Sequence, residues 1–194
     1  MIEQFKDYDQ VKAYSDFQTL PKGAYVLKIM GTSVQTNSNG KYLQIGCDIA
    51  EGEYKDFFTK QYTNDTRETK KWGCNYLLSL PKDDGSEKDM WTKQKFKTFT
   101  TALEESNNGY HWDWDEQKFK GKLIGGLFNE REYQKTDGTI GRATNLDRVC
   151  AAEKIRKGDY KLPEDKLIKR FGNNTSGMDG FVNVPEGTNE ELPF

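Results

Sequence analysis

The chain has 194 residues, of which 34% are hydrophobic and 13% aromatic, a composition that allows one modest core in one domain. Mean hydropathy is -0.94 and no apolar run approaches the length of a membrane span, so we expect a soluble protein. The net charge of -2 excludes the strongly basic character that would by itself identify a nucleic-acid-binding protein.

Charge is distributed unevenly along the chain. Residues 172–194 contain four acidic and no basic side chains, so the remainder carries all 29 basic residues against 27 of the 31 acidic ones. The first residues are also acidic, without the apolar stretch of a secretory signal. The three cysteines show no CxxC spacing, and we expect reduced thiols in a cytoplasmic protein.

The first structured elements are predicted to form a hairpin. Residues 1–20 resemble a polar lead-in to a domain that spans 21–171. Segments 23–36 and 41–52 are rich in β-branched and aromatic residues, and the turn sequence "NSNG" joins them, so we predict two antiparallel strands. In the second segment apolar residues alternate with polar or small ones, as in a half-buried strand: Leu43, Ile45, Cys47 and Ile49.

A third strand and one helix are predicted next. The third strand covers 54–62, with the sequence "YKDFFTKQY", and a short strand or edge segment follows at 70–81. The helix covers 90–107, because its large apolar side chains recur at spacings of three and four. Asp89 is its predicted N-cap.

The last two strands are predicted at 121–134 and 139–151, around the turn sequence "KTDG". The pair Gly125-Gly126 suggests a bulge or sharp bend where a sheet closes. We therefore predict a mainly β fold: an OB-like five-stranded barrel with one helix between the third and fourth strands. A sandwich or a split sheet fits the strand count almost as well. Residues 172–194 are predicted to form a disordered, acidic tail.

Catalytic chemistry has little support in the sequence. The chain lacks the P-loop, dinucleotide-binding and zinc-protease motifs. Its single histidine, His111, lies near three acidic residues, but their spacing matches no known metal site. We favour an interpretation in which Trp112 and Trp114 seat this segment against the helix. The prediction is a protein that is not an enzyme, with no cofactor and no metal.

Binding of single-stranded nucleic acid requires cations for the phosphates and flat side chains on which bases stack. As a strand, 54–62 places both kinds of side chain on one face, and Lys70 and Lys71 follow shortly after it. In the closing hairpin, Arg142 and Arg148 are predicted to share a face. For each aromatic residue by itself, a place in the core is the alternative. The predicted binding residues are Tyr54, Phe58, Lys60, Tyr62, Lys71, Trp72, Tyr133, Lys135, Arg142 and Arg148.

The stretch Asn189-Glu190-Glu191-Leu192-Pro193-Phe194 resembles the tip of bacterial single-stranded-DNA-binding proteins, an acidic stretch closing in Asp-Asp-Asp-Ile-Pro-Phe. With the barrel-like strand order, the chain looks like a phage-encoded protein of that type. The stretch departs from the family in having two acids before the tip and Leu192 in place of Ile. Across most of 23–166, the body is similar to uncharacterised replication- or recombination-associated proteins of phages of Gram-positive bacteria, as in "KYLQIGCDIAEGEYKDFF" and "IRKGDYKLPEDK".

The resemblance implies a function and partners. It implies binding of single-stranded DNA without sequence specificity in phage replication or recombination, in the host cytoplasm. The tip would recruit replication or recombination proteins or compete for the DNA groove, through Glu190, Glu191, Leu192, Pro193 and Phe194. The alternative is a β-rich interaction or assembly protein that does not bind nucleic acid, and an enzyme with an unrecognised carboxylate site comes third. A homo-oligomer is compatible with either of the first two.

Overall fold

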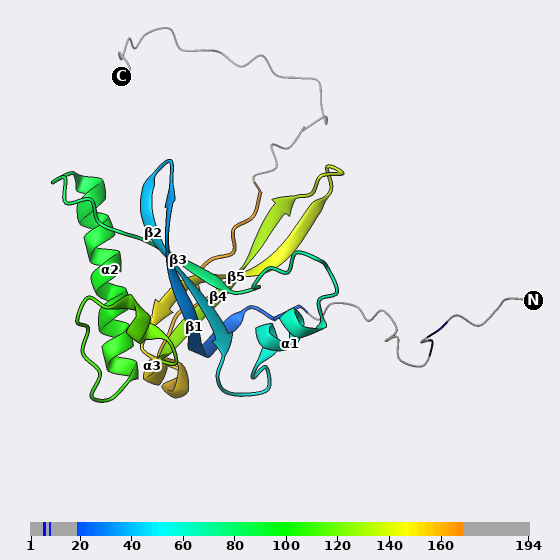
Figure 1. The fold of residues 1–194 in the computed structure, drawn as a ribbon, viewed down its shortest axis with the longest axis horizontal. Coiled ribbons are helices and arrows are strands. Elements are labelled where there is room, and N and C mark those ends of the chain that lie inside the picture. The colour runs from blue at the N-terminus through cyan, green and yellow to red at the C-terminus, as the bar shows by residue number, and fades with distance from the viewer. Residues whose placement is uncertain (1–5, 7, 9–18, 169–194) are drawn as a thin grey trace, which may run out of the picture.

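The computed structural model describes residues 6, 8 and 19–168, and within them the main element is a five-stranded antiparallel sheet (Figure 1). The strands are β1 (Gly23–Asn37), β2 (Gly40–Ile49), β3 (Asn75–Ser79), β4 (Leu123–Gln134) and β5 (Ile140–Cys150). The helices are α1 (Phe57–Asn64), α2 (Glu87–Ser106), α3 (Ala152–Lys157) and the short 3-10 helix η1 (Glu116–Phe119). The predicted tail, 172–194, and most of the predicted lead-in lie outside the described residues.

The predicted first hairpin is confirmed. The Asn37 side chain accepts a hydrogen bond from the backbone N–H of Asn39 (2.9 Å), and Gly40 adopts a φ of 124° that other residues rarely reach. The turn thus joins β1 to β2 in antiparallel register. The predicted alternation is also present, since Leu43, Ile45, Cys47 and Ile49 are all buried.

The prediction of a strand at 54–62 is wrong, because this segment contains a tight turn followed by α1. The buried Asp48 carboxylate, at the end of β2, accepts hydrogen bonds from the backbone N–H groups of Phe58 and Thr59 (2.9 and 3.0 Å). It thereby caps the first turn of α1 from another element. A helix also lets the adjacent Phe57 and Phe58 both reach the core, whereas a strand would send them to opposite faces. The third strand is instead the segment predicted as an edge, β3.

The predicted helix exists as α2, with a different cap. It begins three residues earlier than predicted, and the Ser86 hydroxyl accepts a hydrogen bond from the Asp89 N–H (3.1 Å). Asp89 lies in the first turn, where its carboxylate accepts a hydrogen bond from the Lys82 N–H (2.7 Å). Figure 1 shows α2 along one side of the molecule and α1 on the other. Among the described helices, none combines the length and apolar character needed to cross a bilayer.

The predicted closing hairpin is confirmed as β4 and β5, and its glycines serve close packing. A Cβ added at Gly126 would lie 2.4 Å from Leu27 Cδ1, and one at Gly125 would lie 2.8 Å from a side-chain carbon of Ile155 in α3. The irregularity predicted at these glycines lies just beyond them, because the register with β5 shifts between Leu127 and Phe128.

The sheet order is β3-β2-β1-β4-β5, which places β3 and β5 at its two ends. Within the described residues, β3 and β5 approach each other without forming a hydrogen-bonded ladder, so the sheet is open there. The core lies between the inner face of the sheet and α2, and includes Leu27, Ile29, Ile45, Leu103 and Phe119. The pairing of β1 with β4 stops at Gly23 and Phe128. Further along β4, the segment around Lys166 takes the place of β1, and the Lys166 N–H donates to Glu130 O (2.8 Å).

Candidate nucleic-acid interface

An exposed ring, Tyr62, and a half-buried ring, Trp72, meet on the outer face of β1, β2 and β3, beside α1. The Tyr62 and Trp72 ring centroids are 5.6 Å apart at an interplanar angle of 46°. They border a shallow cavity of 430 Å³ that also touches strand side chains of the outer face. We call this region the Tyr62–Trp72 surface, defined by Met30, Gln44, Tyr62, Lys70, Trp72 and Asn75.

Trp72 is held against β2 by polar contacts. Its indole Nε1 donates a hydrogen bond to Cys47 O (2.8 Å), and Asn75 Nδ2 donates one to Trp72 O (2.8 Å). A Cβ added at Gly46 would lie 3.7 Å from the indole, so the ring lies directly over this glycine. Because the N–H is already bonded on the protein side, the orientation of the ring is set before any ligand arrives.

Tyr62 comes from α1, so its position depends on the Asp48 cap. Its side chain is 40% exposed, and Lys70 Nζ lies 5.6 Å from the centroid of its ring. An ammonium group within about 6 Å of an aromatic face is attracted by the ring quadrupole. The surface therefore combines two fixed rings with a cation, which are the two components that single-strand binding needs.

The loop between α1 and β3 is braced by an ion pair at its start. The Asp65 carboxylate accepts hydrogen bonds from the Arg67 backbone N–H (3.0 Å) and from Arg67 Nε (2.9 Å) and Nη2 (2.7 Å). These bonds hold the pKa of Asp65 at about 2. Asp65 is therefore ionised at neutral pH, and the loop that carries Lys70, Lys71 and Trp72 begins from a fixed point.

The outer face continues along β2 and β3 toward a second depression. Gln44, whose Nε2 donates to Asn75 Oδ1 (3.1 Å), pairs in register with Leu77, which is 61% exposed. Tyr42 and Leu77 then line a smaller cavity of 240 Å³ with Lys41 and Lys82 at its border. Aromatic, polar and basic side chains thus follow one another along the strand pair.

The structure separates the residues predicted on 54–62. Phe58 is buried, and Tyr54 packs edge-on against Tyr25 (5.9 Å between centroids) and Phe57 (6.2 Å), so both contribute to the core. The strand face that was predicted to expose them does not exist, and Phe58 is buried while Tyr54 is half-buried beside the core. Lys60 is exposed on α1 and donates to Lys55 O (2.9 Å).

Of the predicted set, Tyr62 and Trp72 lie together at the Tyr62–Trp72 surface, whereas Lys71 is exposed next to Trp72 in the chain and does not line the cavity. Met30, Gln44 and Asn75 were missed by the sequence analysis. Met30 is exposed at the register shift between Ile29 and Gly31, which no local sequence signal marks. One signal was present, since a glycine inside a strand indicates that another group approaches closely, as Trp72 does at Gly46.

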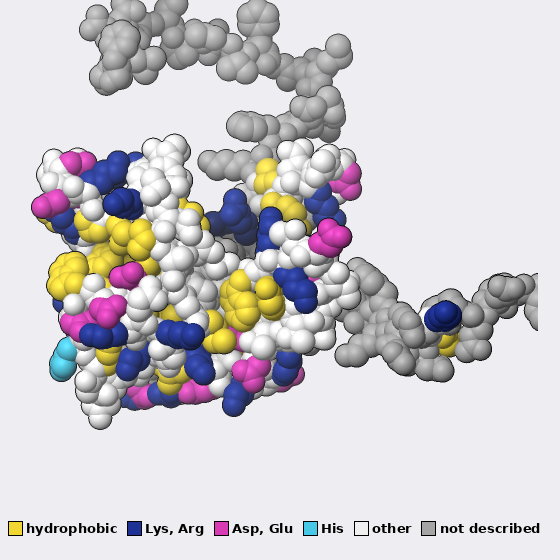
Figure 2. Space-filling model, viewed as in Figure 1, with side chains coloured by type: hydrophobic (Ala, Val, Ile, Leu, Met, Phe, Trp, Pro, Cys, Tyr) yellow, Lys and Arg dark blue, Asp and Glu magenta, His cyan; other side chains and the backbone are white. Residues whose placement is uncertain are grey.

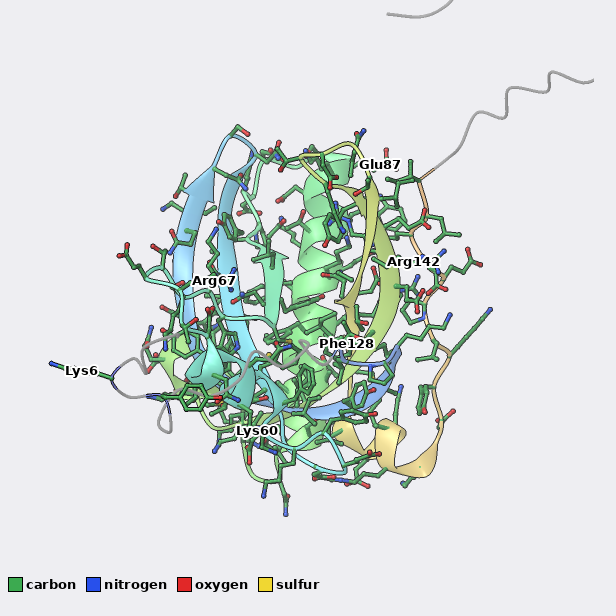
Figure 3. The ribbon with its side chains drawn as sticks, turned by 90° about the vertical axis from the view of Figure 1, so that its right-hand side faces the viewer. Lys6, Lys60, Arg67, Glu87, Phe128 and Arg142 are labelled. Atoms are coloured by element: carbon green, nitrogen blue, oxygen red, sulfur yellow. The ribbon has the colours of Figure 1, made fainter. Side chains whose placement is uncertain are left out.

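The remaining predicted residues lie on the β4–β5 hairpin. Arg142 pairs with Glu132 (3.1 Å) and with Glu130 (3.9 Å), and the Tyr133 ring lies over Gly141. In Figure 3, Arg142 lies on the other side of the view from Arg67, which begins the loop of the Tyr62–Trp72 surface.

Regular alternation along β5 was predicted to place Arg142 and Arg148 on one face. The register shift of β5 against β4 lies between these two residues and interrupts that alternation. Arg148 instead lies 3.5 Å from Asp147. Lys135 is exposed near the turn.

A metal site needs several His, Cys, Asp or Glu side chains close together. Among the described residues, no group of three or more of these side chains is placed to hold a metal ion. His111 is exposed, and its Nδ1 lies 4.0 Å from Glu104 Oε1. Burial raises the pKa of the Cys47 thiol to about 12 and that of Cys74 well above its ordinary value, which keeps both as poorly nucleophilic thiols.

Comparison with known proteins does not identify the chain. No protein-family model matches it, and a search of curated proteins finds no significant match. A functional assignment therefore rests on the geometry of the described residues and on the sequence.

Proposed function

We propose that this protein binds single-stranded DNA without sequence specificity, in the cytoplasm and in the course of DNA replication or recombination. The observation that carries the proposal is the Tyr62–Trp72 pair, two accessible rings fixed on a sheet face with Lys70 beside them. Stacking on an aromatic side chain contributes about 1–3 kcal/mol per base and tolerates every base. Affinity without base discrimination follows from such a surface.

The strand order supports an OB-type arrangement. β1 pairs with β2 and β4, β2 with β3, and β4 with β5, while α2 stands between β3 and β4 in the chain. Five-stranded, partly open Greek-key barrels of this kind bind oligonucleotides on the face of strands 2 and 3 and with the neighbouring loops. We propose that β3 and β5 form the open seam of such a barrel.

The path of the strand would run along β2 and β3. From Gly46 to Tyr42 the outer face extends about 13 Å at the usual rise of a strand. Trp72 and Tyr62 lie at one end, and Tyr42 lies at the other, beside the cavity that Lys41 and Lys82 border. Figure 2 also shows Lys and Arg side chains in the hollow between the β1–β2 and β4–β5 hairpins. Arg142, Arg148, Lys135 and Tyr133 are proposed contacts on that second side.

The proposed partners include proteins as well as DNA. Glu190, Glu191, Leu192, Pro193 and Phe194 are proposed to recruit replication or recombination proteins, as an apolar anchor preceded by acids that favour basic partners. These residues lie outside the described part of the chain, so the proposal rests on their sequence.

A second candidate function is an interaction or assembly protein whose body does not touch nucleic acid. The observation that favours it is an apolar groove beside α2, at which the exposed Trp114 lies. Large exposed apolar surfaces mark sites of protein interaction. The two functions differ in whether the body of the protein binds DNA.

The deciding experiment is fluorescence polarisation of a labelled poly-dT oligonucleotide titrated with the intact chain at low and high salt. We expect binding that weakens as salt rises, and competition by unlabelled single strands of any sequence, with duplex DNA a poor competitor. Absence of binding at low salt, or equal competition by duplex DNA, would exclude the proposal and leave the interaction protein.

A further inference from the structure

An apolar groove lies between α2, the β1–β2 hairpin and the segment around Trp114. We call it the α2 groove and define it by Val34, Leu80, Pro81, Phe96, Trp112 and Trp114. Its volume is 700 Å³, larger than the cavity at the Tyr62–Trp72 surface. Figure 2 shows hydrophobic side chains gathered on the side of the molecule where α2 lies.

The groove is walled by aromatic rings that contact one another. Phe96 stacks on Trp114 with centroids 6.2 Å apart and an interplanar angle of 13°, and Trp112 lies 5.8 Å from Trp114. Trp114 remains 79% exposed despite these contacts. The buried Nε1 of Trp112 has no hydrogen-bond acceptor among the described residues, which is unfavourable for a polar group. The wall therefore presents one exposed indole supported by two half-buried rings, an arrangement suited to an apolar anchor.

The backbone at Trp114 is held in a sparsely populated conformation. Its φ is 68°, a left-handed conformation that is strained for a bulky residue. Of the three described non-glycine residues with positive φ, Asp83 and Trp114 both line this groove. Strain of this kind persists where the surrounding structure requires it, and here it presents an indole to solvent.

The rim of the groove offers one unpaired cation. Lys93 pairs with Asp83 and with Asp89 (3.1 Å to the latter), so its charge is neutralised. Lys97 lies at the rim without an ion pair among the described residues, and Glu116 contributes an opposing negative charge nearby. The groove therefore suits an apolar segment that carries negative charge on the side facing Lys97.

Such a segment exists in the part of this chain that lies outside the described residues. We propose that Glu190-Glu191-Leu192-Pro193-Phe194 docks in the α2 groove of its own chain. The last three side chains pack against Phe96, Trp112 and Trp114, and the two glutamates lie beside Lys97. The inference does not depend on DNA binding, because the α2 groove and the Tyr62–Trp72 surface share no lining residue.

The connecting chain is long enough. Residues 169–189 separate the last described residue from the segment, and 21 residues span up to about 70 Å when extended. The 20 residues of α2 measure only about 30 Å. A tether of this length gives an effective concentration on the order of 1 mM, so a segment with a Kd of about 0.1 mM would occupy the groove about nine-tenths of the time.

The test uses a labelled peptide of residues 186–194, titrated with full-length protein by fluorescence polarisation. Full-length Phe194→Ser should bind the peptide about tenfold more tightly than the unmodified chain, because the competing tethered segment no longer fills the groove. Phe181→Ser is the matched control, since Phe181 lies in the same part of the chain but not in the proposed segment. It should leave the apparent affinity unchanged.

The position of the docking site is tested with further substitutions in the Phe194→Ser protein. Trp114→Ala and Lys97→Glu should each reduce peptide binding at least fivefold, whereas Trp91→Ala and Lys95→Glu should not, because these exposed α2 residues do not line the groove. The proposal is overturned if no variant binds the peptide, or if Phe181→Ser rather than Phe194→Ser increases binding. It is also overturned if sedimentation shows concentration-dependent association that Phe194→Ser abolishes, since the segment would then occupy the groove of a second copy.

Discussion

The Tyr62–Trp72 surface and the α2 groove both expose aromatic rings, but they hold them in different ways. Trp72 is fixed by a hydrogen bond from its Nε1 to a strand carbonyl, among amide side chains and close to Lys70. Trp114 is fixed by ring stacking and a left-handed backbone, among aliphatic side chains. The first setting is polar and basic, and the second is apolar.

The exposure of aromatic residues therefore does not by itself identify the kind of ligand that a surface binds. A ring surrounded by unpaired cations and amides accommodates a base together with its charged backbone. A ring in an apolar groove, with Lys93 paired and Lys97 at the rim, suits an apolar peptide anchor that carries acidic neighbours.

The largest effect is expected from Asp48→Ala, which removes the cap of α1. Without the carboxylate, the N–H groups of Phe58 and Thr59 lose their acceptor, so we expect the free energy of unfolding to fall by about 3 kcal/mol. Urea unfolding followed by circular dichroism measures the change. Glu53→Ala, an exposed acidic residue nearby, is the control and should change it by less than about 0.5 kcal/mol. Equal stability of the two variants would contradict the role of Asp48 as a cap.

The next effect separates the two surfaces by ligand. Tyr62→Ala should weaken poly-dT binding about tenfold, since one stacking platform contributes about 1–3 kcal/mol. Trp114→Ala should change DNA affinity less than about twofold, because Trp114 does not line the Tyr62–Trp72 surface. Fluorescence polarisation with both variants provides the measurement. If Trp114→Ala weakens DNA binding more than Tyr62→Ala does, the comparison between the surfaces is wrong.

A smaller effect concerns charge. Lys70→Ala removes one proposed phosphate contact, so the slope of log Kobs against log salt should become shallower by about 0.7 for a single strand. Lys95→Ala on α2 serves as the control and should leave the slope unchanged, since Lys95 lines neither cavity. Titrations at four or more salt concentrations determine both slopes. Indistinguishable slopes for the two variants would remove Lys70 from the DNA path.

The smallest effect concerns Asp65 and pH. Its pKa lies at about 2 in the folded protein because Arg67 stabilises the carboxylate, below the ordinary 3.8 of the unfolded chain. The stabilising contribution is therefore fully present above about pH 4 and is lost as the pH falls toward 2. NMR titration of the side-chain carboxyl carbon should show this pKa, and Arg67→Ala should return it toward 3.8. An unchanged pKa in Arg67→Ala would show that Arg67 is not the cause.

Local signals were sufficient for much of the fold. The turn sequences at 37–40 and 135–138, with apolar alternation beside them, predicted both hairpins, and helical periodicity predicted α2. These features depend on residues that are close in sequence, so local conformational preferences and the burial pattern agree. At the candidate site, the same reasoning selected Tyr62 and Trp72, which lie together at one surface, but the exposed strand face on which it placed Phe58 and Tyr54 does not exist.

By itself, the sequence determined a mainly β chain with two hairpins and a long helix, because turns, alternation and periodicity are local. Only the tertiary structure decided that 57–64 is a helix, since its cap comes from Asp48 on a neighbouring strand. It also decided which aromatic residues are accessible, because that depends on which elements cover them. The grouping of Met30, Gln44 and Asn75 beside Trp72 likewise follows from strand register and a bulge, which arise between strands and leave no local mark.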